Sequence, residues 1–184
     1  MKVLIFDTET SGLCAWQHEM LQLAWQVVDT GDWSVLAQHN CYFPFPKDKR
    51  KVSPQAIRVN GLTAEVLEAK GTMQRAKAIG MFAADMATVD ACAAHNFYFD
   101  VDFVNVRDTK DLISWPDEKI CTMRQTTNLC AIPGYYANEY KWPRLSELAD
   151  FLGVDTSGIQ YHDAMADVEV TKRCLKVLFE KYWK

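Results

Sequence analysis

Two acids follow the first apolar segment of the chain, where Phe6 is succeeded by Asp7-Thr8-Glu9. Because side chains alternate along a strand, Asp7 and Glu9 are expected on one side of it, roughly 7 Å apart, with Thr8 on the other. Two carboxylates at the end of a buried strand are costly to leave unpaired, and no Lys or Arg lies near them in the sequence. The pair therefore predicts a divalent-cation site. The alternative is that one acid caps the strand in solvent.

A further acid, Asp100, lies one helical turn after Asn96 in the segment HNFYFD. Residues four apart share a helix face, and the apolar Phe103 continues that face. An acid among apolar neighbours is not needed for solubility, which makes Asp100 a candidate for the same site. Asp102 is expected to point to solvent. His95 alone is more typical of a hydrogen-bonded histidine at a strand end than of a catalyst.

Another group, His162, Asp163 and Asp167, opens the last long helix. Asp163 is expected to cap the helix, which leaves His162 in the preceding loop and Asp167 one turn inside, facing inward with Thr171. Histidine titrates near neutral pH and is suited to proton transfer. Taken singly, each residue has a structural alternative. Asp167 could be a first-turn acid favoured by the helix dipole, and His162 could serve the fold alone.

The elements that must position these residues are a strand meander followed by alternating helices and strands. Strands are predicted over Lys2–Phe6, Met20–Asp29, Ser34–Phe43, Thr88–Ala94 and Ile120–Cys121. Helices are predicted to start after the N-caps Ser53 and Thr63 and at Gly71-Thr72, and to cover Asn96–Val106, Thr122–Cys130, Leu145–Leu152 and Asp163–Tyr182. The segment Ala131–Pro143 predicts a loop. This order indicates an α/β domain with a mixed sheet.

The composition is that of an ordinary globular protein. The 184 residues carry 20 Lys and Arg against 24 Asp and Glu, a net charge of −4, with 49% hydrophobic residues. This balance argues against a protein that holds duplex DNA through a broad basic face, since such binding neutralises many phosphates. No apolar run is long enough to span a membrane, and the start predicts a strand rather than a signal peptide. A cytoplasmic location without a membrane partner is therefore expected. The six cysteines lack zinc-site spacing and are expected to be reduced.

Taken together, the acidic segments resemble the motifs of the DEDDh (DnaQ-like) family of 3′→5′ exonucleases. The segments are FDTETSGL, HNFYFDVDF and YHDAMADVEVT, which carry Asp7, Glu9, Asp100, His162 and Asp167. VSPQAIRVNGLTAEVL is similar to a family segment that usually ends in His-Gly-Ile-Thr, with Asn60 in place of the histidine. SPQA and ICTM resemble exonuclease X-type members. The resemblance implies an α/β, ribonuclease H-like fold with a central mixed five-stranded sheet flanked by helices, and a single exonuclease domain over residues 1–184.

The resemblance also implies hydrolysis of phosphodiester bonds by a two-metal mechanism. Two Mg²⁺ or Mn²⁺ ions would be held by Asp7, Glu9, Asp100 and Asp167. His162 would act as the general base and take a proton from the attacking water. The expected products are nucleoside 5′-monophosphates, released from the 3′ end of a nucleic acid.

Contacts with the substrate follow from the same resemblance. The residues expected to bind it are Thr8, Thr10, Leu13, Asn96 and Phe97. Thr10 would meet the terminal 3′-hydroxyl and Leu13 would wedge against the last base. Phe97 and Trp16 are candidate stacking surfaces, with plain packing as the alternative. The basic cluster Lys47–Lys51 would guide the strand, or would be a solvated turn.

More than one function is compatible with these motifs. The expected substrate is single-stranded or 3′-ended nucleic acid, DNA more than RNA, with a polymerase or repair complex as a possible partner. One alternative is a non-catalytic nucleic-acid-binding or protein-binding domain on the same fold. Another is an endonuclease of the ribonuclease H type, against which the spacing of His162 and Asp167 argues. The chain ends directly after its last predicted helix, which favours a free-standing enzyme or one that docks through its surface.

Overall fold

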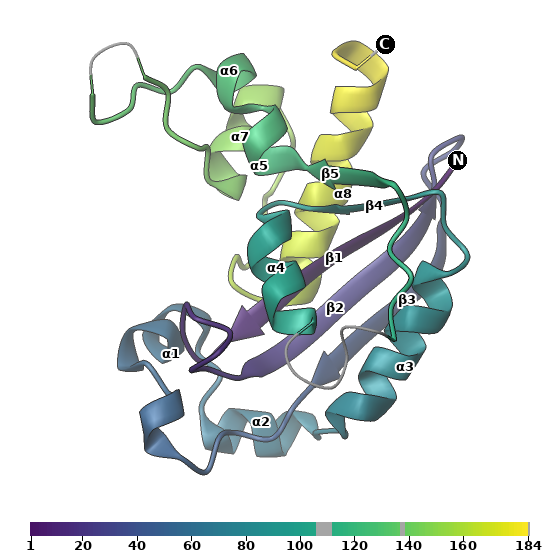
Figure 1. The fold of residues 1–184 in the computed structure, drawn as a ribbon. Helices are drawn as coiled ribbons and strands as arrows, with labels where there is room; N and C mark the ends of the chain where they lie inside the picture. Colours follow the sequence, from purple (N-terminus) through teal and green to yellow (C-terminus); the bar gives the residue numbers. More distant parts are fainter. Residues whose placement is uncertain (106–111, 137–138, 184) are drawn as a thin grey trace.

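The computed structural model describes residues 1–105, 112–136 and 139–183. Its centre is a five-stranded sheet in the order β3-β2-β1-β4-β5 (Figure 1). The strands are β1 (Lys2–Thr10), β2 (Met20–Asp29), β3 (Val35–Tyr42), β4 (Ala91–Ala94) and β5 (Glu118–Cys121). The first three form an antiparallel meander, whereas β4 and β5 extend the sheet parallel to β1. The predicted mixed sheet with its N-terminal meander is confirmed.

Helices cover both faces of this sheet. They are α1 (Pro54–Asn60), α2 (Ala64–Lys70), α3 (Arg75–Met86), α4 (Phe97–Val104), α5 (Thr122–Gln125), α6 (Thr127–Cys130), α7 (Leu145–Leu152) and α8 (Ala164–Lys181), with a 3₁₀ turn η1 at Lys49–Lys51. α3 and α4 pack on one face, and α8 crosses the other with α7 beside it (Figure 1). Layers of this kind bury both sides of the sheet, which explains why β1 and β2 are almost continuously apolar.

β1 divides its side chains between the two layers. Leu4 and Phe6 belong to the core under α3 and α4, whereas Val3 and Ile5 pack against α8. All four are at most 1% exposed. The same alternation continues into the acidic end of the strand, so that Asp7 and Glu9 follow the face of Val3 and Ile5, and Thr8 follows that of Leu4 and Phe6. The strand thus sends its two acids toward the start of α8.

The predicted helix starts agree closely with the structure. The side chains of Ser53, Thr63 and Asp163 accept hydrogen bonds from backbone N–H groups in the first turns of α1, α2 and α8. Each bond satisfies a donor that the helix itself leaves unpaired. These caps depend only on neighbouring residues, which is why the sequence pattern locates them.

Some strands and helices begin or end at other residues than predicted. These are places where hydrogen bonds to a distant segment set the boundary. β1 continues to Thr10 instead of ending at Phe6, because its acidic end pairs with β2. α3 begins at Arg75 rather than at Thr72, since the N–H of Met73 donates to the carbonyl of Tyr42 and holds this segment extended. The strand predicted from Thr88 begins only at Ala91.

Two further predicted segments differ from the structure in detail. The helix predicted over Thr122–Cys130 is broken into α5 and α6 at Thr126, whose backbone leaves helical geometry. The loop predicted over Ala131–Pro143 contains a short bridge between Pro133 and Tyr140. The predicted end of the helix at Val106 lies outside the described residues.

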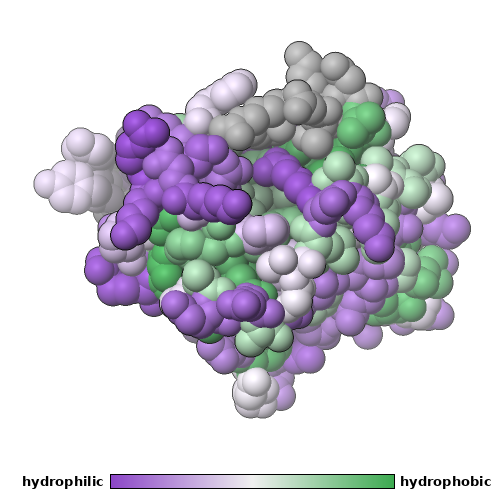
Figure 2. All heavy atoms as spheres, turned by 90° about the horizontal axis from the view of Figure 1, so that it is seen from below, coloured by the Kyte–Doolittle hydropathy of each residue, from purple (hydrophilic) through white to green (hydrophobic). Residues whose placement is uncertain are grey.

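The surface combines hydrophilic side chains with local apolar groups. On the face seen in Figure 2, hydrophobic atoms gather between hydrophilic side chains instead of being evenly spread. In the described ranges, no helix combines the length and apolarity that crossing a bilayer requires.

Candidate active site

The acidic segments converge where β1 ends beside α4 and the start of α8. Asp7, Glu9, Asp100, His162 and Asp167 all line one cavity of about 330 Å³. The possible ligand atoms of Glu9, His162 and Asp167 lie within 4.8 Å of one another. Residues more than 150 positions apart in the sequence are thus brought together. The structure unites all the residues that the sequence motifs single out for catalysis.

Burial and mutual repulsion raise the pKa of every carboxyl in this cavity. Burial is the largest cause at each of the four, and it raises the pKa of Glu9 to about 8 and those of Asp100 and Asp167 to about 7. Asp7 has its pKa raised well above the ordinary value, by burial first and then by the charges of Asp100, Asp167 and Glu9. Four acids held this close favour the binding of a cation that would restore their charged forms.

Thr8 holds Asp100 in place from the opposite face of β1. The carboxylate oxygen Oδ1 of Asp100 accepts hydrogen bonds from the Thr8 backbone N–H at 3.0 Å and from its hydroxyl at 2.7 Å. Both residues are buried, with exposed fractions of 6% for Thr8 and 2% for Asp100. These two bonds lower the pKa of Asp100 against the larger effect of burial. Thr8 therefore orients an acid, which is a role apart from direct substrate contact.

The turn before α8 places His162 at the mouth of the cavity. His162 has a left-handed backbone with φ of 67°, which is uncommon for a residue with a side chain. Its backbone N–H donates to Oδ2 of Asp167 at 3.3 Å. The His162 side chain is exposed, and the next residue, Asp163, caps the helix. This turn brings the imidazole to the same cavity as Glu9 and Asp167.

Gln22 on β2 anchors this turn, and the sequence motifs do not reveal it. The side chain is fully buried; its amide nitrogen donates to Asp163 at 3.3 Å, and its oxygen accepts from the N–H of Ala164 at 3.2 Å. Gln22 pairs with Glu9 across the antiparallel strands. A glutamine in a largely apolar strand is the sequence signal that could have identified it, although Gln26 in the same strand shares that signal.

The donor set fits a divalent metal ion. Oδ1 of Asp167 is buried and has no hydrogen-bond partner. In the part of the chain that the structure describes, none of Asp7, Glu9, Asp100 and Asp167 forms an ion pair with Lys or Arg. Carboxylate oxygens are the ligands that Mg²⁺ and Mn²⁺ prefer. An unpartnered carboxylate oxygen among other acids is what a hard cation would satisfy.

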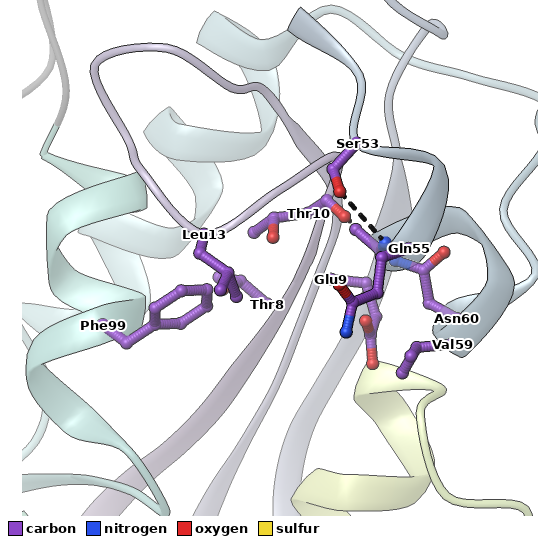
Figure 3. Close-up of a pocket in the computed structure, with 10 residues that line it drawn as sticks. Thr8, Glu9, Thr10, Leu13, Ser53, Gln55, Val59, Asn60 and Phe99 are labelled. Carbon is purple, nitrogen blue, oxygen red and sulfur yellow. Dashed lines mark hydrogen bonds between the residues drawn. The ribbon is translucent and has the colours of Figure 1, made fainter.

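A smaller and more apolar cavity of about 210 Å³ adjoins the carboxylate cavity. The two share Thr8, Glu9 and Phe99 as lining residues. Leu13 and Phe99 lie on one side of it, and Gln55, Val59 and Asn60 of α1 lie on the other (Figure 3). We call this space the α1 cavity. It has room for a small organic group next to the acids.

Asn60 and Thr10 shape the floor of the α1 cavity. The Asn60 side chain donates to the Thr10 carbonyl at 3.0 Å, and its hydrogen bond to Glu9 lowers the pKa of that acid against the effect of burial. The Thr10 hydroxyl donates to the Gly12 carbonyl at 2.6 Å. An amide at position 60 thus supports both the strand end and its acid.

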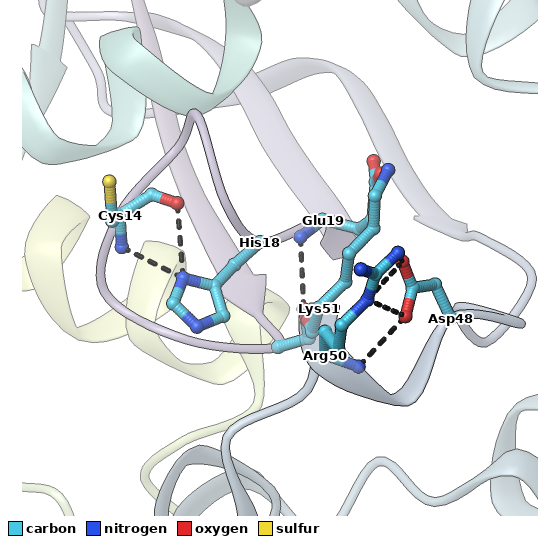
Figure 4. A network of polar contacts seen from close by, with 7 residues as sticks. Cys14, His18, Glu19, Asp48, Arg50 and Lys51 are labelled. Carbon is cyan, nitrogen blue, oxygen red and sulfur yellow. Dashed lines mark hydrogen bonds and ion pairs between the residues drawn. The ribbon is translucent and has the colours of Figure 1, made fainter.

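The segment 11–19 carries Leu13 and is held by polar contacts within itself and with the segment around Lys51 (Figure 4). The Ser11 hydroxyl donates to the Lys51 carbonyl and accepts from the Glu19 N–H, while the Lys51 and Glu19 side chains form an ion pair. A Cβ at Gly12 would lie 2.1 Å from the ring of His18, so only glycine allows this close approach. Leu13 itself is 84% exposed at the tip of the segment.

The predicted substrate contacts are distributed unequally. Asn96 lines the carboxylate cavity, whereas Thr10 and Leu13 line the α1 cavity. Phe97 is only 2% exposed, so the prediction that it stacks on a base is wrong. It packs edge-on against Phe6 in the core, with ring centroids 5.6 Å apart.

Phe99 is the aromatic residue of α4 that borders both cavities, and sequence reasoning missed it. Its position directly before Asp100 was the available signal. Trp16 is 79% exposed. In the basic cluster, Arg50 pairs with Asp48 at 2.9 Å and Lys51 pairs with Glu19, so much of its charge is already neutralised locally.

Comparison with known proteins shows which family combines this fold with these motifs. The model of the family described as Exonuclease (RNase_T) matches residues 4–175. The chain belongs to this exonuclease family. The predicted membership of the DEDDh (DnaQ-like) exonuclease family is confirmed.

Two curated relatives of this exonuclease are DNA polymerase III epsilon subunits. The subunit of Pasteurella multocida (strain Pm70) is 26% identical over 172 residues, which cover 91% of this chain and 64% of the relative. That of Haemophilus influenzae is 26% identical over 175 residues, covering 91% and 63%. The chain thus spans less than two thirds of the length of these relatives.

Solved structures similar to the exonuclease include several of exonuclease I. One exonuclease I structure matches with a TM-score of 0.76 and 21% identity over 98% of this chain and 41% of the other. The enzyme from Methylocaldum szegediense matches with a TM-score of 0.75 and 19% identity, over 100% of this chain and 41% of the other. The Escherichia coli enzyme in complex with a dA16 oligonucleotide matches with a TM-score of 0.71 and 21% identity, over 98% of this chain and 41% of the other. These similarities confirm the ribonuclease H-like fold.

Proposed function

We propose that this chain hydrolyses the terminal phosphodiester bond at the 3′ end of single-stranded or 3′-ended DNA and releases nucleoside 5′-monophosphates. The observation that carries the proposal is the carboxylate cavity, which gathers four acids and a histidine and adjoins the α1 cavity. A cleavage site beside a pocket for one terminal nucleoside is what removal of single nucleotides requires. A non-catalytic binding domain would gain nothing from four neighbouring acids, one buried and three half-buried, whose pKa values are raised.

Asp7, Glu9, Asp100 and Asp167 are the residues that would hold two Mg²⁺ or Mn²⁺ ions. When bound, such ions stabilise the charge on the attacking and leaving oxygens of a phosphoryl displacement. Because the carboxyls must be ionised to bind cations, their raised pKa values couple metal affinity to pH. The unpartnered Oδ1 of Asp167 and the fixed orientation of Asp100 support this role.

His162 is the general base in this proposal. Its side chain is exposed at the cavity mouth, where it can take a proton from water and return it to solvent. The left-handed turn and the bond from its N–H to Asp167 set the direction of the imidazole. Gln22 supports the same turn through Asp163.

The α1 cavity would receive the terminal nucleoside. Leu13 and Phe99 offer apolar contact to one face of a base, and Val59 lies across from them (Figure 3). Because the Thr10 hydroxyl already donates to Gly12, it is left to accept a hydrogen bond from a terminal 3′-hydroxyl. Asn96 would contact the strand on the side of the carboxylate cavity.

Substrate class and partners belong to the same proposal. Exonuclease I of Escherichia coli has been seen with dA16 and dT13 oligonucleotides, which supports single-stranded DNA. Association with a polymerase and a cytoplasmic location are supported by the epsilon-subunit relatives. We also propose that residues 1–184 form a single exonuclease domain.

The test is hydrolysis of matched 20-nucleotide DNA and RNA strands, each with a free or a blocked 3′ end, with Mn²⁺ or Mg²⁺ and with excess chelator. We expect nucleoside 5′-monophosphates only from free 3′ ends, only with metal, and faster from DNA. Cleavage of 3′-blocked strands would identify an endonuclease instead. Equal activity in chelator would contradict the metal assignment, and binding without hydrolysis would favour a non-catalytic domain.

A further inference from the structure

An arginine between two exposed aromatic rings lies next to the carboxylate cavity, outside the residues assigned so far. The guanidinium carbon of Arg124 on α5 lies 4.2 Å from the ring centroid of Tyr98 and 5.5 Å from that of Trp142. Tyr98 is 50% exposed and Trp142 is 58% exposed. We call Tyr98, Arg124 and Trp142 the aromatic platform. In the described residues, no carboxylate forms an ion pair with Arg124.

His95 joins this platform to the carboxylate cavity that it lines. Its Nε2 lies 3.0 Å from the Pro143 carbonyl and its Nδ1 lies 3.0 Å from the Thr122 hydroxyl. Burial lowers the pKa of His95 to about 4, so the ring is neutral. Since a carbonyl only accepts, Nε2 carries the proton and the Thr122 hydroxyl donates to Nδ1.

These two bonds fix both halves of the platform beside the cavity. Thr122 begins α5, which carries Arg124, and Pro143 directly follows Trp142. Tyr98 lies two residues before Asp100 on α4. The segments that carry Arg124 and Trp142 are therefore both tied to His95 by partly buried hydrogen bonds.

The platform and the α1 cavity lie on different sides of the acids. In Figure 1, α1 lies to the left of the end of β1, whereas α5 lies above it. A strand whose terminal nucleoside occupies the α1 cavity has its scissile phosphate at the acids. Its remaining nucleotides must then leave the cavity away from α1, toward His95 and Asn96.

We propose that the aromatic platform binds the bases of a single strand upstream of the scissile phosphate. This inference rests on the proposed function, because it takes the direction of the strand from the cleavage site. Aromatic faces stack on any base, and a guanidinium adds attraction for the phosphates without sequence preference. The occupant is single-stranded nucleic acid because His95, which lines the cavity that must receive its 3′ end, is hydrogen-bonded to the segments that carry Arg124 and Trp142.

The test compares a dinucleotide, too short to reach the platform, with a ten-nucleotide single strand. We expect Trp142→Ala and Arg124→Gln each to raise KM for the ten-nucleotide strand about tenfold, as loss of one stacked base predicts, and to leave dinucleotide hydrolysis within about twofold. Trp142→Phe should restore most of the loss. Phe151→Ala, which removes an exposed aromatic ring that packs on Tyr182, is the matched control. It should leave the hydrolysis of both substrates unchanged.

A binding measurement separates failure of the platform from failure of the proposed function. In an Asp7→Asn background, fluorescence anisotropy of a labelled ten-nucleotide strand should show about tenfold weaker binding with Trp142→Ala. Arg124→Gln should also reduce the salt dependence by about 0.7 in the slope of log K against log salt. If wild-type protein hydrolyses nothing, this titration still tests the platform. Unchanged affinity in both variants, or equal losses on dinucleotide and long strand, would overturn it.

Discussion

The two adjoining cavities at the end of β1 are built from different kinds of structure. The carboxylate cavity takes its acids from β1, α4 and α8, whose backbones are fixed by the sheet and the core. The α1 cavity has one side on the segment Ser11–Glu19, which projects from the sheet and is held by a few polar contacts. The four acids thus stand on regular elements, whereas part of the α1 cavity stands on a surface segment, where chains vary most readily.

The cavities also differ in charge. The carboxylate cavity concentrates acids whose pKa values are raised, at a cost to the stability of the metal-free protein. The α1 cavity exposes apolar side chains, such as Leu13, that contribute little to folding. Substitutions in the first should therefore affect chemistry and stability in opposite directions, and substitutions in the second should affect substrate binding alone.

Asp7→Asn is expected to have the largest effect on activity. Asp7 is one of the four acids that would hold the metal ions, so its loss should lower metal-dependent hydrolysis by more than about 10⁴-fold. The same change should raise the melting temperature of the metal-free protein at pH 8, because it removes a carboxyl whose ionisation is opposed by burial and by neighbouring acids. Hydrolysis rates and thermal unfolding in chelator measure the two effects. A large loss of stability would show that Asp7 serves the fold instead.

His162→Asn should lower kcat by roughly 10²- to 10⁴-fold, since it removes the proton acceptor. Asparagine tolerates the left-handed backbone of this position, so the fold and metal binding should be preserved. Calorimetric titration with Mn²⁺ and single-turnover kinetics check both expectations. His39→Asn, on β3 at a distance from the cavities, is the matched control. Unaltered turnover in His162→Asn would rule out its role as base.

Leu13→Ala and Phe97→Ala sharpen the distinction between cavity and core. Leu13→Ala should raise KM roughly tenfold while changing unfolding free energy by less than about 0.5 kcal/mol. Phe97→Ala should cost about 3–5 kcal/mol of stability and leave KM of the folded protein nearly unchanged. Denaturant unfolding measures the change in unfolding free energy, and steady-state kinetics on the same preparations measures the change in KM. The reverse pattern would return Phe97 to the substrate site.

The pH dependence of stability gives the smallest expected effect. Glu9 holds its proton up to about pH 8 in the folded protein, against an ordinary value of 4.5. Between these values the folded state binds more protons than the unfolded one, so metal-free stability falls as pH rises. Mn²⁺ should therefore raise the melting temperature by about 3 °C or more at pH 8 and by less than about 1 °C at pH 5. An equal shift at both pH values would contradict binding by these acids.

Prediction from the sequence was most successful where the signal is local. The caps Ser53 and Asp163, and the acids at the end of β1, are recognised from residues adjacent in the chain. Prediction was less successful where contacts with a distant segment decide whether a side chain is buried or exposed. Phe97 and Phe99 are two residues apart on one helix and chemically identical, yet one is in the core and the other borders both cavities.

The sequence by itself therefore singled out the residues that we propose for the chemistry, because the motifs specify residue type and spacing along the chain. It also determined the family, since these motifs extend over most of its length. Only the tertiary structure decided which side chains face the cavities, how Gln22 and Thr8 orient the catalytic groups, and how far burial raises the carboxyl pKa values. The physical reason is that hydrogen-bond partners, burial and electrostatic repulsion depend on distances between segments that the linear order does not contain.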